Sequence, residues 1–369
     1  MSIDVEVLSA PAQRVLSAAA PAPLKLLAAK GVIPGAAPPD AFSVIVHLAE
    51  TSEDEKVKLQ ARATLQSPPR PLLEGALSAQ VQLGVLAALA EYGQIDAVLL
   101  PKVLAQQSLD EDVLCVFSQN ADEAKGEVIA TNEALLLRFP RAIEKLYMNK
   151  LVRMSTSDRL LELAVRNDIE LDFPAFKLAA QAIMSQLIPE ASEELTYDDI
   201  EFQKAEELAE AAELGEDEDV CERDDEGKEV VTKKAQPVFV IVQNASVTTL
   251  IRMAMVGNST ARLLLVRHTN RLVSEAAAKS PRMTENEAGQ IAASRAVSEQ
   301  VLRIIASNRE FVRSYTVKLN LVNNPLTPFT FVSRLMPFLR QVDLKLLARS
   351  KNVPGQVSKA AKNVLSRQK

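Results

Sequence analysis

The stretch AKSPRMTENEAGQIAASRAVS, residues 278–298, carries two copies of one connection around a short segment of mixed polarity. The copies are Ala278-Lys-Ser-Pro-Arg-Met-Thr284 and Ala292-Ala-Ser-Arg-Ala-Val-Ser298. In each copy the small polar third residue ends one helix, and the apolar sixth residue packs back into the core. The Ser or Thr at the seventh position then accepts hydrogen bonds from the free amides of the next helix. The stretch therefore predicts a helix over 285–293 between two tight connections.

The same connection recurs along the chain. Further copies start at Leu321, Ala348, Leu104, Val116 and Ala28, and looser copies start at Leu65 and Ala164. The helices between them are too short to be stable alone in water, so each needs a neighbour, as in stacked helical repeats. The 369-residue chain is 47% hydrophobic but only 4% aromatic, which favours packed helices over a β-sandwich. We expect an all-α protein, an α-solenoid of short helical repeats, with Leu302 and Leu321 in its core.

A family resemblance rests on the stretch Asn324-Pro-Leu-Thr-Pro328 and on helices that end in Ala-x-Ser or Ala-x-Asn. These helices restart on an apolar residue followed by a cap. The pattern resembles the HEAT-like and leucine-rich-repeat-variant α-solenoids of bacterial proteins, over roughly two thirds of the chain. The resemblance implies right-handed stacks of helices that serve mainly as interaction surfaces.

An acidic segment separates two apolar blocks of very different charge. Glu190 to Glu229 holds 19 Asp or Glu against 3 Lys or Arg, a net charge of −16, whereas Pro237 to Lys369 carries +14 and Met1 to Pro189 carries −6. So much like charge with so little apolar surface does not fold by itself, although FQKAEELAEAAEL at 202–214 predicts one helix within it.

Four parts are therefore expected. They are a partly flexible N-terminal segment (1–23), an N-terminal helical-repeat domain (24–189), an acidic and largely disordered linker (190–236) and a basic C-terminal helical-repeat domain (237–369). In the last domain, the β-like run Val238 to Val242 is expected to be an apolar lead-in to a helix over 247–256. That helix should stop at a left-handed Gly257-Asn258, and a further helix is predicted over 310–322.

Neither a catalytic nor a cofactor-binding pattern is evident. His47 and His268 are the two histidines, and neither lies at metal-ligand spacing from Cys or a carboxylate. A core or boundary role is expected for His47, and a charged His268 is expected to cap a helix C-terminus. Phosphate-binding glycine loops of the GxGxxG or GxxxxGK[ST] type are absent. We predict a protein that is not an enzyme and that has no cofactor and no metal site.

The expected compartment is the cytoplasm. Cys115 and Cys221 form neither a disulfide framework nor a metal spacing, which suits two free thiols in a reducing environment. Asp4 and Glu6 stand where a secretory signal carries basic residues, and no uncharged apolar run is long enough to span a membrane.

The basic C-terminal block is the strongest candidate for a binding surface. The residues predicted to bind a polyanion or an acidic partner are Arg262, Arg267, Arg271, Arg303, Arg309, Arg313, Lys318, Arg340, Lys345, Arg349 and Lys351.

Three occupants of this surface remain open. The acidic segment itself could fold back onto it, since the opposite charges are adjacent in sequence. An acidic protein partner could bind there, with the segment as a competing decoy. Nucleic acid could bind through phosphate contacts that weaken steeply with salt. A non-catalytic scaffold or adaptor that binds protein partners is the favoured function, and a nucleic-acid-associated module masked by the acidic linker is the alternative.

Overall fold

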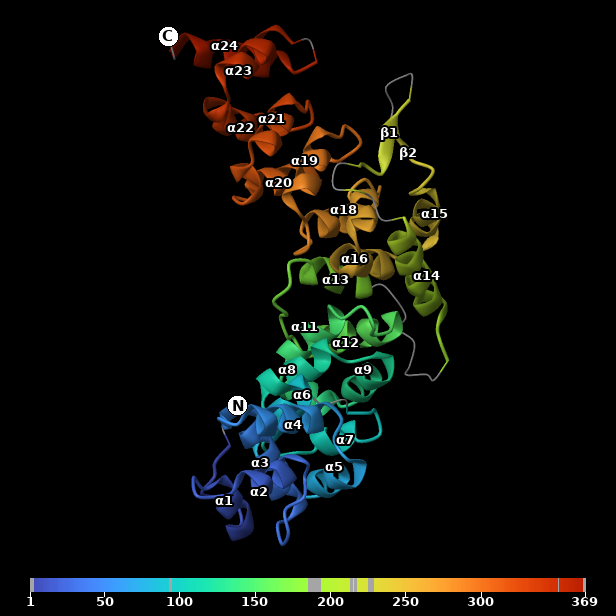
Figure 1. Ribbon diagram of the computed structural model, residues 1–369. Helices are drawn as coiled ribbons and strands as arrows, with labels where there is room; N and C mark the ends of the chain where they lie inside the picture. Colours follow the sequence, from blue (N-terminus) through green and yellow to red (C-terminus); the bar gives the residue numbers. More distant parts are fainter. Residues whose placement is uncertain are drawn as a thin grey trace. The chain divides into compact units, whose positions relative to one another are not determined.

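A computed structural model describes residues 3–92, 95–184, 194–212, 215, 218–224, 229–350 and 352–367 (Figure 1). The chain divides into two compact units, Met1–Leu171 and Asp172–Lys369. In the described ranges all regular structure is helical apart from one small antiparallel sheet. Within these ranges, too, no helix combines the length and apolar character that a membrane crossing would need.

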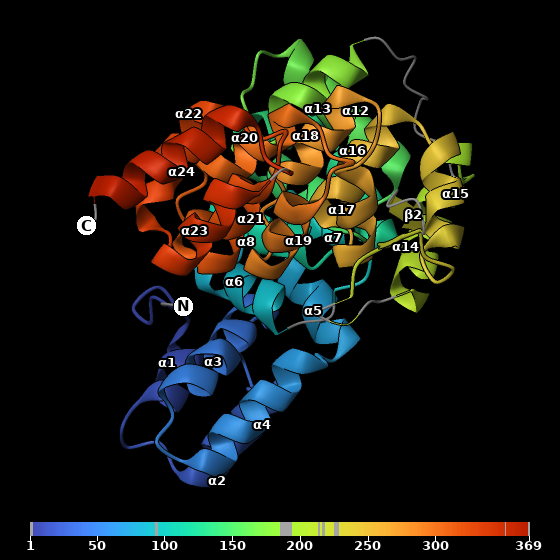
Figure 2. The same cartoon turned by 90° about the horizontal axis from the view of Figure 1, so that it is seen from above.

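The first unit contains helices α1 to α12. Their bounds are α1 (Ala10–Leu16), α2 (Ala22–Ala29), α3 (Pro38–Thr51), α4 (Glu55–Gln66), α5 (Arg70–Leu77), α6 (Leu83–Glu91), α7 (Leu100–Leu104), α8 (Glu111–Gln119), α9 (Glu123–Ala130), α10 (Glu133–Arg138), α11 (Arg141–Tyr147) and α12 (Met154–Arg166). Helices α3 and α4 lie side by side (Figures 1 and 2), and further along α6 packs on α8, α8 on α11, α7 on α9 and α9 on α12. Packing is thus between elements that are close in sequence.

The second unit contains helices α13 to α24, two strands and two 3-10 helices. Their bounds are α13 (Phe176–Ile183), α14 (Tyr197–Ala211), β1 (Cys221–Arg223), β2 (Glu229–Val231), α15 (Gln236–Asn244), α16 (Val247–Val256), α17 (Ser259–Leu265), α18 (Arg271–Ala278), α19 (Glu285–Ala293), α20 (Glu299–Ser307), η1 (Phe311–Arg313), α21 (Tyr315–Asn323), α22 (Phe329–Leu335), η2 (Met336–Phe338), α23 (Gln341–Arg349) and α24 (Gly355–Arg367). Strands β1 and β2 pair antiparallel, with Glu222 opposite Val230.

Alternate helices of the second unit pack on one another. Helix α16 packs on α18 and α18 on α20, while α17 packs on α19 and α19 on α21. Each short helix therefore gains the neighbours that it needs for stability. The expected core positions Leu302 and Leu321 are both fully buried between these helices.

Side-chain amides join successive connections. The Asn324 amide donates to the carbonyl oxygens of Ala292 and Ser294 at 2.8 and 2.6 Å. In the first unit, the Asn149 amide donates in the same way to the carbonyls of Ser118 and Ala121 at 3.0 and 2.8 Å. Backbone carbonyls at helix ends have no partner within their own helix, so these asparagines stabilise the connections that the sequence pattern identified.

Several predicted caps are confirmed. Asp110, Asp122, Thr284 and Ser298 each accept a hydrogen bond from the third backbone amide of the following helix. Thr284 forms a complete capping box with Glu287. Helices α16 and α19 begin and end where the sequence predicts them.

The prediction of a largely disordered acidic linker is wrong for the described residues of 190–236. Helix α14 begins with a capping box between Thr196 and Asp199 and buries Phe202, Ala205 and Ala209. The Arg252 guanidinium of α16 lies 4.6 Å from the centre of the Phe202 ring. Charge repulsion within the segment is therefore offset by tertiary contacts with the basic block, which composition alone does not reveal.

Three local predictions in the second unit also need correction. The β-like run Val238 to Val242 lies within helix α15. Gly257 is not left-handed but extended, and Asn258 caps α17. A side chain at Gly257 would lie 2.4 Å from the Met253 carbonyl oxygen, so close approach explains this glycine. The helix predicted over 310–322 breaks at Ser314, whose extended backbone separates η1 from α21.

Candidate basic interaction groove

Two of the predicted binding cations are structural. The Arg262 guanidinium lies 2.6 Å from the Glu287 carboxylate and donates to the Gly257 carbonyl at 2.7 Å. The side chains of Arg262 and Glu287 are only 6% and 5% exposed. Arg267, 8% exposed, contacts the carboxylates of Asp219 and Glu229 at 2.9 and 3.4 Å. Internal carboxylates therefore occupy both guanidiniums: Arg262 meets Glu287 of its own block, and Arg267 meets two carboxylates of the acidic segment, one of the three occupants that the sequence left open.

The acidic hairpin, β1–β2 with its flanking residues, does fold back onto the basic block. The Glu229 carboxylate accepts hydrogen bonds from the Ser294 hydroxyl at 2.6 Å and from the Arg295 amide at 2.8 Å, as well as from Arg267. The Gln290 amide donates to the Glu218 carbonyl at 3.2 Å. Part of the negative charge of the segment is thus neutralised inside the second unit.

Three more predicted cations have partners at the surface. Arg271 pairs with Glu275, and Arg303 pairs with Glu299 at 2.8 Å, each within its own helix. The Arg340 guanidinium lies 4.6 Å from the centre of the Tyr315 ring. The Glu275 carboxylate is only 7% exposed, whereas Arg303 and Glu299 are both exposed. An exposed pair contributes little to stability, so Arg303 remains weakly held. Lys351 lies outside the described residues.

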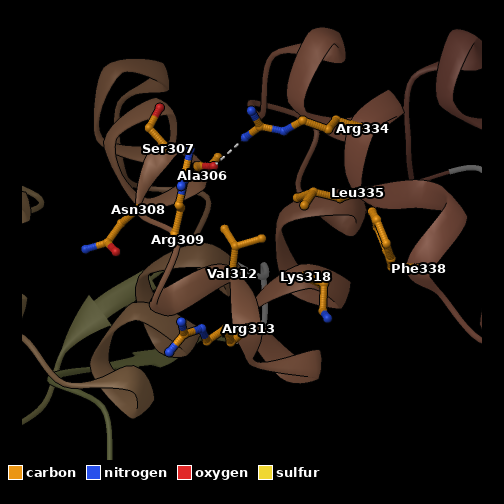
Figure 3. Close-up of a pocket in the computed structure, with 10 residues that line it drawn as sticks. All are labelled: Ala306, Ser307, Asn308, Arg309, Val312, Arg313, Lys318, Arg334, Leu335 and Phe338. Carbon is orange, nitrogen blue, oxygen red and sulfur yellow. Dashed lines mark hydrogen bonds between the residues drawn. The ribbon is translucent and has the colours of Figure 1, made fainter.

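Arg309, Arg313 and Lys318 come together in one groove of about 580 Å³ (Figure 3). Its lining residues are Ala306, Ser307, Asn308, Arg309, Val312, Arg313, Lys318, Arg334, Leu335 and Phe338. They come from the end of α20, from the connection that follows it, from η1 and α21, and from α22 and η2. No carboxylate is among them, and none of the described Asp or Glu side chains forms an ion pair with Arg309, Arg313 or Lys318.

Two chain breaks create the groove. Helix α20 ends at Ser307, and the extended Asn308 redirects the chain into η1. The extended Ser314 then ends η1 and starts α21. Because η1 is a single turn set between two extended residues, Arg309, Val312 and Arg313 are presented along the wall of the groove instead of along one continuous helix.

The opposite wall is fixed by Arg334. Its guanidinium donates to the Ala306 carbonyl at 2.9 Å and lies 5.1 Å from the centre of the Phe331 ring. This hydrogen bond, the dashed line in Figure 3, ties α22 to the end of α20. It leaves the positive charge of Arg334 beside the groove.

The floor and one rim are apolar. Val312 points into the space between Arg309 and Leu335 (Figure 3), and Leu335 is buried. Phe338 is 68% exposed at the rim. An aromatic ring so exposed beside four cations gives the groove both an apolar anchor point and a strong positive potential.

A basic and apolar face of α23 follows Phe338 in the chain. Val342 and Leu346 are 67% and 64% exposed, and Lys345 and Arg349 are exposed on the same helix. The buried residues Leu344 and Leu347 lie on the other side of α23. The groove together with this α23 face is called the basic groove surface below.

The apolar part of this surface and Arg334 were not among the predicted site residues. Val342 and Leu346 are four residues apart, a spacing that the sequence shares with ordinary core stripes. A usable signal is that α23 carries two apolar pairs, Val342 with Leu346 and Leu344 with Leu347, on opposite sides of the helix. When a helix packs against its neighbours on one side, the pair on the other side stays exposed.

The histidines and thiols do not form a reactive site. Burial lowers the pKa of His268, and its Nδ1 accepts a hydrogen bond from the Asn270 amide at 3.0 Å. Only an unprotonated nitrogen can accept, so the expected charged cap is wrong and a neutral ring is held here. Burial also lowers the pKa of His47 and raises the pKa values of the Cys115 and Cys221 thiols. Among the described side chains, no three His, Cys, Asp or Glu are grouped so that they could hold a metal ion.

Comparison with known proteins finds neither a protein-family model nor a curated protein that matches this chain.

Proposed function

We propose that this protein is a non-catalytic scaffold, an α-solenoid of HEAT-like repeats that binds acidic, apolar segments of partner proteins in its basic groove surface. The observation that carries the proposal is the composition of the groove: Arg309, Arg313, Lys318 and Arg334 line it without a carboxylate, next to an exposed Phe338. Alternate-helix packing supports the repeat architecture, since such stacks present extended side-chain surfaces.

The charge of the groove favours a carboxylate-rich ligand. Arginine binds carboxylates through two parallel hydrogen bonds, and opposite potentials speed association and select partners. Arg309 and Arg313 are exposed and unpaired with described carboxylates, so they do not have to give up an internal partner on binding. Binding of a ligand therefore does not have to break an existing ion pair.

The apolar rim favours a protein over nucleic acid. Buried aromatic anchors dominate the affinity of protein interfaces, and Phe338 is available for that role. Part of the positive charge of residues 237–369 is neutralised inside the fold, where Arg262 and Arg267 pair with carboxylates. Arg309, Arg313, Lys318 and Arg334 gather around one groove that has an apolar rim. Further exposed cations, among them Arg282, Arg295, Lys359 and Lys362, lie outside the groove and could serve nucleic acid, which binds through cations along its phosphate backbone. The nucleic-acid module stays the alternative, with the same residues as its binding site.

Selection from a phage-displayed library of random short peptides on the full-length protein tests the proposal. Enriched peptides are expected to combine Asp or Glu with large apolar residues. Their affinity should fall by about tenfold or more in the Arg309→Glu/Arg313→Glu variant, because charge reversal replaces attraction with repulsion. The matched control is Lys359→Glu/Lys362→Glu, which makes the same charge change at exposed positions on α24.

Two outcomes overturn the proposal. One is that no acidic consensus emerges, or that the groove variant binds the selected peptides as well as the wild type does. The other is that duplex DNA binds more tightly than any peptide and loses affinity with salt at a slope of about −0.9 per phosphate contacted.

A further inference from the structure

The exposed side of α14 combines apolar residues with two exposed carboxylates, whereas the basic groove surface combines apolar residues with cations. Phe202, Ala205 and Ala209 bury one side of this helix. On the opposite side Tyr197 is 66% exposed, and Ile200 and Leu208 are each more than one third exposed. Ile200 follows Tyr197 by three residues and Leu208 follows Ile200 by eight, so all three lie on one side of the helix. Of the charged residues of α14, Glu207, Glu210 and Lys204 are exposed, with Lys204 midway between Ile200 and Leu208, while Asp198, Glu201 and Glu206 are half-buried and Asp199 is buried in the capping box.

The α14 face is preformed. The Asn258 amide donates to the Ala209 carbonyl at 2.6 Å, and the Thr260 hydroxyl donates to the Ala212 carbonyl at 3.1 Å. These bonds hold the C-terminal end of α14 against the start of α17, while the capping box holds its N-terminal end. A partner that binds this face therefore does not have to order a flexible segment, which removes a major entropic cost of binding.

One copy of the chain cannot bring the two surfaces together. Helix α14 packs on α15 and α16, whereas the groove is built from α20 to η2. In Figure 1, α14 lies beside α15 and α16 at one end of the second unit, and α22 and α23 lie toward its other end. The contacts with α16 and α17 fix α14 in that place, so complementarity between the surfaces can be used only between copies.

We propose that the basic groove surface of one copy binds the α14 face of a second copy. The proposal rests on the proposed function, because it names a partner for the same groove. Phe338 and Leu346 would pack against Tyr197 and Leu208, and the exposed carboxylates of Glu207 and Glu210 would meet Arg309 and Arg313. Since each copy carries both surfaces, the contact is head-to-tail and leaves one free surface at each end of the assembly.

Two variants each remove one surface. The groove variant is Arg309→Glu/Arg313→Glu, and the helix variant is Tyr197→Ser/Leu208→Ser. The helix variant keeps the carboxylates of α14, so it gains no attraction for the reversed groove. Lys359→Glu/Lys362→Glu is the charge-matched control, and Val7→Ser/Leu59→Ser, at two exposed positions of the first unit, is the matched control for loss of apolar surface.

Sedimentation velocity of the full-length protein, over a range of concentrations and at low and high salt, measures the assembly. The wild type and both controls are expected to associate with increasing concentration, and less so at high salt. Each surface variant alone should associate at least about tenfold more weakly. An equimolar mixture of the two variants should restore one contact and stop at a dimer, because the remaining surfaces are the disabled ones.

A monomeric wild type at all concentrations, or a mixture of variants that stays monomeric, overturns the inference. If the library peptides still bind the groove in that case, the proposed function stands and only self-association falls. If neither peptides nor a second copy bind, both fail. Circular dichroism of each variant identifies one that has lost its helical fold, and Arg309→Gln/Arg313→Gln then replaces the groove variant.

Discussion

Replacing Glu287 with alanine is expected to destabilise the second unit strongly, because it leaves the buried Arg262 charge without a partner. The Arg262 guanidinium contacts the Glu287 carboxylate at 2.6 and 3.4 Å, and both side chains are almost fully buried. The same carboxylate accepts from the Thr284 amide at 2.7 Å and so completes the cap of α19.

The size of the effect follows from the two roles of Glu287. Breaking a buried ion pair by removing one partner costs about 3 to 5 kcal/mol, and losing half of a capping box adds up to about 1 kcal/mol. Replacing both partners, in Arg262→Met/Glu287→Met, removes the buried charge altogether. We expect that double variant to lose less than about 2 kcal/mol, most of it from the Gly257 carbonyl and the Thr284 amide, which lose a partner.

Urea denaturation followed by circular dichroism measures the free energy of unfolding, and hydrogen exchange in α17 and α19 locates the loss. Glu285→Ala, at an exposed position in the first turn of the same helix, is the control and should cost less than about 1 kcal/mol. The reasoning is refuted if Glu287→Ala costs no more than this control, or if the double variant is as unstable as the single one.

Two further predictions concern the acidic hairpin and the asparagine connections. Burial raises the pKa of Glu229, but the hydrogen bonds it accepts and the Arg267 charge outweigh burial and hold that pKa below its ordinary value. The hairpin should therefore stay docked above the ordinary glutamate pKa and detach as the pH falls through the lowered pKa of Glu229, which exposes Cys221. In a variant that lacks Cys115, the reaction of Cys221 with 4,4′-dithiodipyridine should accelerate over that pH range. A rate that follows only the intrinsic pH dependence of the thiol would contradict the docking. Asn324→Ala should cost about 1 to 3 kcal/mol, because two carbonyls lose a buried donor, whereas the same change at the exposed Asn323 should be nearly silent in the same denaturation assay.

Sequence patterns predicted the helices best where the determinants are local. Asp110, Asp122, Thr284 and Ser298 cap helices because their side chains reach amides only a few residues away. Such contacts are fixed by spacing and residue type, so a single sequence is enough to find them.

The acidic segment shows what a single sequence cannot supply. Its composition is that of a disordered chain, and it is ordered because Arg252 covers Phe202 and Arg267 meets Asp219 and Glu229. These partners lie tens of residues away. Composition reports the charge of a segment but not the charges that the fold brings against it.

The candidate site was predicted only in part, because a sequence does not show which cations the fold pairs with carboxylates. Arg309, Arg313 and Lys318 do meet in one groove, but Arg262 is as basic in sequence and is buried against Glu287. Periodicity does not distinguish the two cases, because availability depends on tertiary neighbours. Phe338 was missed since an exposed aromatic residue and a buried one have the same pattern along the chain.

Photo-crosslinking from position 338 tests most directly whether the basic groove surface is a protein-docking site. Benzoylphenylalanine in place of Phe338 in the full-length protein should crosslink to a selected acidic peptide, and Arg309→Glu/Arg313→Glu should abolish the crosslink. The same probe in place of Val7, which is 73% exposed in the first unit, should give none. Equal crosslinking from both positions, or crosslinking at 338 that survives charge reversal in the groove, would contradict the proposed function.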